Sequence, residues 1–207
     1  MPQNGPLVAE LSQADFARVA RGGEILSGAG EKIEPIMGGI SSVSRCAARE
    51  VHRRSPEAAV AYFDGKTANW ALQGGRAAAT VGAYRVSLER YIAWDGGSGS
   101  AEAFDLGTRM APIIFAPGDS VRALAHIVRQ DTAGREARIL LWDDLSLDEG
   151  AAAMIALPVV ERVNNVHGSG AASTVEVWQL AGGTRVSVRP HVAEAQRGAV
   201  RTLLAEV

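Results

Sequence analysis

Residues 174–192 read TVEVWQLAGGTRVSVRPHV, and this stretch decides the fold. Two runs of alternating apolar and polar residues flank Gly182-Gly183. A Gly-Gly loop tolerates the positive φ angles of a tight turn, so the stretch predicts a β-hairpin. With the two glycines as the turn, Gln179 is expected opposite Val186, Val177 opposite Val188, and Glu176 opposite Arg189.

The alternation gives the predicted hairpin two faces. One face carries Val175, Val177, Val186 and Val188, and the other carries Glu176, Trp178, Arg185 and Arg189. A cross-strand ion pair and an arginine beside an indole stabilise a sheet surface. Because Trp and Arg are also enriched in the centres of protein interfaces, Trp178, Arg185 and Arg189 are predicted interface residues.

The remaining patterns predict an α+β fold with a mainly antiparallel sheet. Between residues 59 and 94, Asp64-Gly65 and Gly74-Gly75 separate three alternating runs, which predicts a three-stranded meander. Further strands are expected over residues 111–115, 137–142 and 159–166. Strands and helices do not alternate regularly, which argues against a doubly wound parallel sheet.

About four to five helices are expected to pack with this sheet. Capping residues and apolar spacing place them over residues 12–21, 42–54, 119–130, 146–158 and 192–207. The chain of 207 residues is expected to form a single domain. Within it, residues 1–56 form a helical N-terminal region with a glycine-rich arm (24–40), and residues 57–207 form the α+β core.

Composition excludes several classes of function. The net charge of −2 gives no global attraction to nucleic acid or to anionic membranes. The single cysteine, Cys46, cannot form a disulfide within the chain. The start of the chain does not resemble a signal peptide, and no apolar run is long enough to span a membrane. We therefore expect a cytoplasmic protein without membrane contact.

Carboxylates at expected strand ends suggest one kind of catalysis. These are Asp64, Glu89, Asp143 and Asp144. Such groups bind Mg²⁺ and position phosphodiesters in nuclease-like enzymes. The competing interpretation makes Asp64 a turn residue and places Asp143 and Asp144 in a loop before a helix N-terminus. The four histidines lack metal-ligand spacing and no cofactor motif occurs, so neither a metal nor a cofactor is expected.

Arg45, Arg49 and Arg53 recur at helical spacing, and Arg54 extends their basic end. A stripe of this kind neutralises phosphates, so it is the candidate contact for nucleic acid. It is equally suited to an acidic patch on a neighbouring subunit. Arg45, Arg49 and Arg53 are therefore also predicted interface residues.

The leading hypothesis from these patterns is a non-catalytic assembly subunit of a homo-oligomeric particle, such as a virion or phage component or a similar shell. The glycine-rich arm, the Trp and Arg face, and the scarcity of lysine (two, against 19 arginines) favour contacts with copies of itself. The alternatives are the metal-dependent phosphoryl-transfer enzyme and a small-molecule or peptide-binding module whose sheet forms the floor of a pocket.

Overall fold

The computed structural model describes residues 9–25, 35–95, 103–106, 112–130 and 134–207. These residues form seven helices and eight strands, and the strands make one five-stranded and one three-stranded sheet. Two strand pairings are parallel and the rest are antiparallel. This confirms the predicted α+β class with a mainly antiparallel sheet.

The C-terminal hairpin forms from β7 (Ala172–Gln179) and β8 (Thr184–Val188). The observed pairs are Val175–Val188, Glu176–Ser187, Val177–Val186, Trp178–Arg185 and Gln179–Thr184. The predicted register is therefore wrong by two residues, and Glu176 does not face Arg189. The turn is longer than Gly182-Gly183 because Leu180 is fully buried and donates its N–H to the carbonyl of Leu141. A shift of two residues leaves every side chain on its predicted face.

The five-stranded sheet has the order β2-β5-β6-β7-β8, with β2 (Ala103–Leu106), β5 (Ala125–Gln130) and β6 (Arg135–Leu141). The predicted strand over 137–142 is confirmed as β6, at the centre of this sheet. β6 runs parallel to β7, and helix α5 (Glu149–His167) connects them, since parallel neighbours need a crossover.

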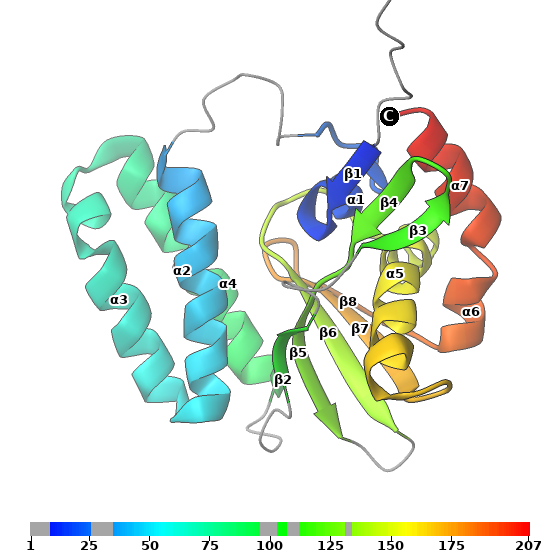
Figure 1. The fold of residues 1–207 in the computed structure, drawn as a ribbon. Helices are drawn as coiled ribbons and strands as arrows, with labels where there is room; N and C mark the ends of the chain where they lie inside the picture. The colour runs from blue at the N-terminus through cyan, green and yellow to red at the C-terminus, as the bar shows by residue number, and fades with distance from the viewer. Residues whose placement is uncertain (1–8, 26–34, 96–102, 107–111, 131–133) are drawn as a thin grey trace, which may run out of the picture.

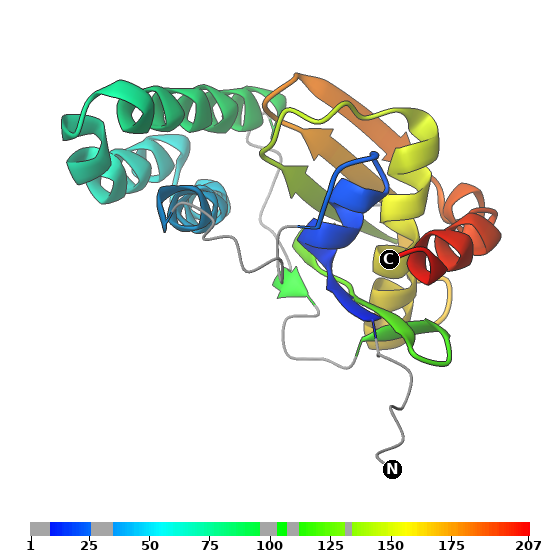
Figure 2. The ribbon, with the colours of Figure 1, turned by 90° about the horizontal axis from the view of Figure 1, so that it is seen from above.

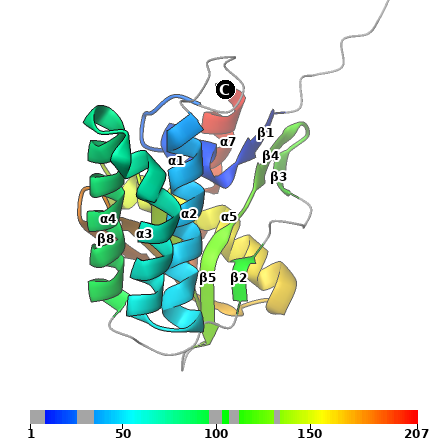
Figure 3. The same cartoon turned by 90° about the vertical axis from the view of Figure 1, so that its left-hand side faces the viewer.

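Helices cover both faces of this sheet (Figure 1). Ala137, Ile139 and Leu141 of β6 join the core under α5, whereas Leu140 and Trp142 join a second core under the helical layer, which comprises α2 (Pro35–Arg53), α3 (Pro56–Leu72) and α4 (Gly75–Asp95). Seen from above, α3 lies farthest from the sheet (Figure 2). Seen from the side of the helical layer, the three helices lie in front of the sheet (Figure 3).

The helical layer replaces the meander predicted over residues 59–94. Ser55 caps α3 by accepting a hydrogen bond from the Ala58 N–H, and Pro56 occupies its first turn. Asp64-Gly65 lies inside α3, and Gly74-Gly75 is the turn between two helices, with φ angles of 68° and 53°. The alternating pattern misled because alanine dominates the segment, and alanine is the strongest helix former.

Two further predicted elements are wrong. Residues 119–130 form β4 (Asp119–Arg122) and β5 instead of a helix. Ala125, His126, Ile127 and Val128 are buried in succession, as in a strand covered on both faces. Residues 159–166 belong to α5, which continues through Pro158 and begins at its N-cap Asp148 instead of Ser146.

The three-stranded sheet pairs β4 with β1 (Ala9–Ser12) and with β3 (Ile113–Ala116), the latter matching the predicted strand over 111–115. Helix α1 (Gln13–Val19) begins at the predicted cap, Ser12, which accepts from the Asp15 N–H. The predicted C-terminal helix is divided into α6 (Pro190–Glu194) and α7 (Arg197–Ala205).

The predicted arm over residues 24–40 is shorter in the structure, because α2 begins at Pro35, seven residues before the predicted helix start. Residues 26–34 of the arm, residues 96–102 and the first eight residues of the chain lie outside the described residues. Among the described helices, none has the length and apolarity needed to cross a membrane.

Candidate interaction surface

The outer face of α3 carries small and apolar side chains. Polar and charged residues lie among them, and the exposed positions are Glu57, Ala61, Asp64, Gly65, Lys66, Ala68, Asn69, Ala71 and Leu72. The opposite side of α3 buries Ala59, Phe63 and Thr67 against the rest of the helical layer. Leu72 ends the face and is 85% exposed, the highest value among the large apolar residues of the described chain.

Helix α4 continues this surface. Its exposed positions are Gly75, Arg76, Ala79, Gly82, Ala83, Val86, Glu89 and Ala93, while Val81, Leu88 and Tyr91 are buried on the other side. Val86 is 53% exposed. We call the exposed positions of α3 and α4 together the α3–α4 face.

A groove of about 520 Å³ opens between the two helices at the end of the α3–α4 face that is remote from the turn. Its apolar lining comes from Pro56, Val60 and Ala61 on α3 and from Ile92 and Ala93 on α4. Glu57, Asp64 and Glu89 complete the lining, so the groove combines an apolar floor with acidic edges.

Arg85 organises two of these acids. Its guanidinium lies 2.8 Å from an oxygen of Asp64 and 2.8 Å from an oxygen of Glu89. Glu57 has a different partner, the side chain of Ser55. The hydrogen bond that Ser55 donates lowers the pKa of the Glu57 carboxyl. Asp64 and Glu89, two of the acids named for the alternative enzyme hypothesis, are therefore brought together by an arginine.

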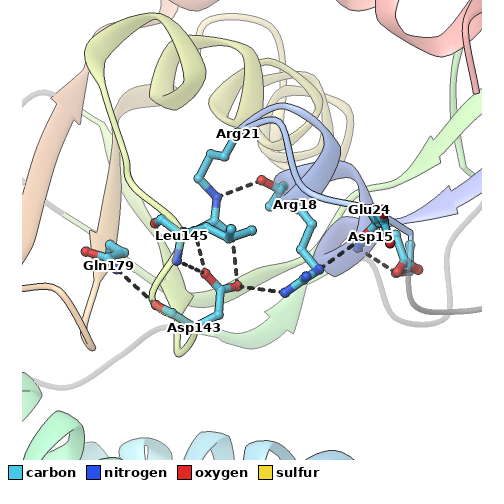
Figure 4. Close-up of polar contacts among 9 residues, drawn as sticks. Asp15, Arg18, Arg21, Glu24, Asp143, Leu145 and Gln179 are labelled. Atoms are coloured by element: carbon cyan, nitrogen blue, oxygen red, sulfur yellow. Dashed lines mark hydrogen bonds and ion pairs between the residues drawn. The ribbon is translucent and has the colours of Figure 1, made fainter. Parts of the chain in front are cut away.

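The other two predicted catalytic acids lie beyond β6. Asp143 accepts hydrogen bonds of 2.6 and 2.9 Å from the Arg21 guanidinium, and one of 3.1 Å from the Leu145 N–H (Figure 4). The side chain of Gln179 donates to the Asp143 carbonyl. Asp144 beside it is exposed. These contacts tie α1 to the end of the sheet, and the described residues contain no cluster of three or more His, Cys, Asp or Glu able to hold a metal ion.

Behind the helical layer, a buried charge network joins it to the sheet. Arg138 of β6 is 2% exposed and pairs with Asp95 at the end of α4. The same guanidinium lies 2.7 Å from Glu136, and Glu136 lies 2.9 Å from Arg129. Burial acts to lower the pKa of Arg138, but the hydrogen bond to Asp95 and the nearby acidic groups raise it above its usual value. Arg138 therefore stays charged.

Aromatic side chains surround this network. The Arg138 guanidinium lies 4.4 Å from the centre of the Trp178 ring, and Trp178 packs on Tyr91 and Trp94. The Tyr91 hydroxyl and His52 are hydrogen-bonded. Burial, with Asp95 nearby, raises the pKa of the Tyr91 phenol. Sequence reasoning missed Arg138, although a charge inside the apolar run ARILLW indicates a buried partner.

The predicted interface residues divide into buried and exposed groups. Trp178 is 2% exposed and belongs to the core between the layers, not to the outer surface. Arg185 and Arg189 are exposed, and Arg185 lies 5.5 Å from the Trp178 ring. Trp178 contacts Arg138 and Arg185, but its ring lies inside the molecule.

The arginine stripe of α2 is only partly at the surface. Arg53 and Arg54 are exposed, whereas Arg45 and Arg49 are half-buried. Burial lowers the pKa of Arg49. Burial, followed by the proximity of Arg45 and Arg49, lowers the pKa of His126 in β5 to about 3. Arg45 and Arg49 therefore lie near the sheet, and the basic surface of α2 that phosphates could contact is smaller than the sequence predicted.

A scan of protein-family models gives no match to this chain, and a search of curated proteins finds no relative.

Proposed function

We propose that the chain is a non-catalytic assembly subunit that binds copies of itself through the α3–α4 face. One observation carries this proposal: two neighbouring helices expose many small and apolar side chains between a few charged ones, with Leu72 and Val86 more than half exposed. Contiguous exposed apolar surface on a folded chain favours burial against a partner. Assemblies such as virions or other protein shells are built from repeated contacts of this kind.

The chemistry of the acids supports the same proposal. Arg85 already pairs with Asp64 and Glu89, and Arg21 already pairs with Asp143. A subunit contact needs such fixed charges at its margin, where they set partner orientation more than affinity.

The test is light scattering at increasing protein concentration, which reports the mass of the particle. We expect wild-type protein to form particles heavier than one chain. The variant Val86→Asp introduces a charge in the middle of the α3–α4 face and is expected to shift the mass to one chain, because a buried unpaired charge opposes association.

Ile114→Asp is the matched control. Ile114 lies on β3, outside the helical layer, and is 70% exposed. This variant is expected to retain the wild-type mass. A wild-type protein that stays a single chain at every concentration contradicts the proposed function, as does an equal loss of mass in both variants.

A further inference from the structure

We infer that two copies pair in an antiparallel manner, so that the turn between α3 and α4 of one copy, with Leu72, enters the groove of the other copy. This inference rests on the proposed function and adds the geometry of the contact. The α3–α4 face has a protruding apolar end at Leu72 and a recessed apolar end at the groove. A two-fold axis through the middle of the face brings each protruding end onto the recessed end of the other copy.

The two ends cannot meet within one chain. Glu57 in the groove and Leu72 are 15 residues apart on one continuous helix, which separates them by roughly 22 Å at about 1.5 Å per residue. Leu72 therefore has no route into the groove of its own chain. A second copy supplies an apolar side chain to the groove that Val60 and Ile92 line.

The middle of the face has glycines that the chain itself does not require. A Cβ atom on Gly65 of α3 or on Gly82 of α4 would meet no atom within 4 Å, and neither residue has a positive φ angle. Glycine inside a helix weakens it. Gly39 on α2 differs, since a Cβ there would lie 3.0 Å from the Trp70 ring. Gly65 and Gly82 are explained by close approach of a partner helix.

Charge distribution selects the antiparallel orientation. The groove end carries three acids, Glu57, Asp64 and Glu89, against one arginine, Arg85, whereas the first turn of α4, at the protruding end, carries the exposed Arg76. Antiparallel pairing places Arg76 of one copy beside the acids of the other copy. Parallel pairing places acids against acids, which opposes association.

A pair of charge-reversed variants tests this arrangement. Arg76→Glu and Glu89→Arg are each expected to lose self-association at least tenfold, because like charges then meet at both ends of the contact. Mixed in equal amounts, the two variants restore opposite charges at both ends. Native mass spectrometry of the mixture, with one variant isotope-labelled, is expected to show heterodimers far in excess of either homodimer.

Disulfide trapping tests the antiparallel arrangement separately from the proposed assembly role. In a Cys46→Ser background, Leu72→Cys protein mixed with Ala93→Cys protein is expected to give the mixed disulfide under mild oxidation. Homodimeric Leu72→Cys disulfides without the mixed product overturn the antiparallel arrangement while leaving the assembly role standing. Wild-type protein that remains a single chain overturns the assembly role as well.

A glycine variant shows whether self-association can be lost while the chain stays folded. Gly65→Gln is expected to keep or raise the melting temperature of the single chain, because space is open around Gly65. The same variant is expected to lose self-association, since its side chain separates the helices. Retained self-association overturns the inference of close helix approach.

Discussion

Arg138 is the residue on which the joining of the two layers depends. It is buried, and Asp95 and Glu136 supply its opposite charges. Removing one partner of a buried ion pair leaves a desolvated charge, which costs far more than the pair contributes. The network is therefore a sensitive point of the fold.

Asp95→Asn is expected to lower the free energy of unfolding by about 3 kcal/mol, because Arg138 keeps its charge and loses its main counter-charge. Urea unfolding measures this. Arg54→Ala, which removes an exposed pair with Glu50, is the control and is expected to cost less than about 0.5 kcal/mol. Equal losses in the two variants contradict the structural role of the network.

His126 makes stability depend on pH. Its Nδ1 accepts a hydrogen bond of 3.0 Å from the Leu140 N–H, so the folded state requires the neutral ring. The pKa is about 3 when folded and about 6.5 when unfolded, so the unfolded chain binds the proton first as pH falls. This contribution to stability is complete above about pH 6.5 and declines toward pH 3, by up to about 1.4 kcal/mol per pH unit.

Urea unfolding between about pH 4 and pH 7.5 tests this linkage. His126→Asn retains an acceptor near the Leu140 N–H and removes the titration. The variant is expected to show a shallower fall in unfolding free energy below about pH 6.5. Parallel curves for variant and wild type would show that other groups cause the acid sensitivity.

At the scale of elements, the sequence predicted best where two signals agreed. The C-terminal hairpin had alternation and turn glycines, and β6 had a run of apolar residues interrupted by Arg138 and bounded by a polar segment. The residues on each face of the hairpin were assigned correctly. Its register was not, because Arg90 of α4 donates to the carbonyls of Leu180 and Ala181 and holds the longer turn. A contact from a distant helix leaves no trace in the local pattern.

The α3 and α4 helices were missed for a related reason. Their buried residues, such as Phe63 and Leu88, are few, and the outer face carries alanine, leucine and valine among its charges, so helical periodicity is weak. That same outer face is the candidate interaction surface. The sequence analysis singled out Asp64 and Glu89, which lie on the α3–α4 face, but assigned them to strand ends. It placed the contact surface on Trp178, which the fold buries.

The Gly74-Gly75 turn offers a test at this scale. Gly74 has a φ of 68° and open space around its missing side chain, so only the backbone opposes substitution. Gly74→Ala is expected to lower the free energy of unfolding by about 1–2 kcal/mol. Gly198→Ala in α7, also in open space, is expected to raise it by about 0.5–1 kcal/mol. Denaturant unfolding compares the two, and a stabilising Gly74→Ala would contradict the turn.

At the scale of the whole molecule, the helical layer and the sheet share one core. Tyr91, Trp94 and Trp178 pack together across the boundary between them. All four tryptophans lie in this core or pack against it. The two layers should therefore lose their structure together.

Tryptophan fluorescence and far-ultraviolet circular dichroism are expected to give the same urea midpoint for the dilute single chain. Fluorescence reports the shared core, and circular dichroism reports all helices, including α5 on the far side of the sheet. Coincident transitions indicate one cooperative unit. A separate early fluorescence transition would show that the helical layer detaches first.

The order of the two layers along the chain also has a consequence for biosynthesis. Helices α2, α3 and α4 leave the ribosome before β6 and β7, which carry the surface that they cover. At about 5–20 residues per second, Tyr91 waits roughly 4–20 s for Trp178 to be made. During that interval the nascent helices display their aromatic side, and holding chaperones have a defined window in which to bind it.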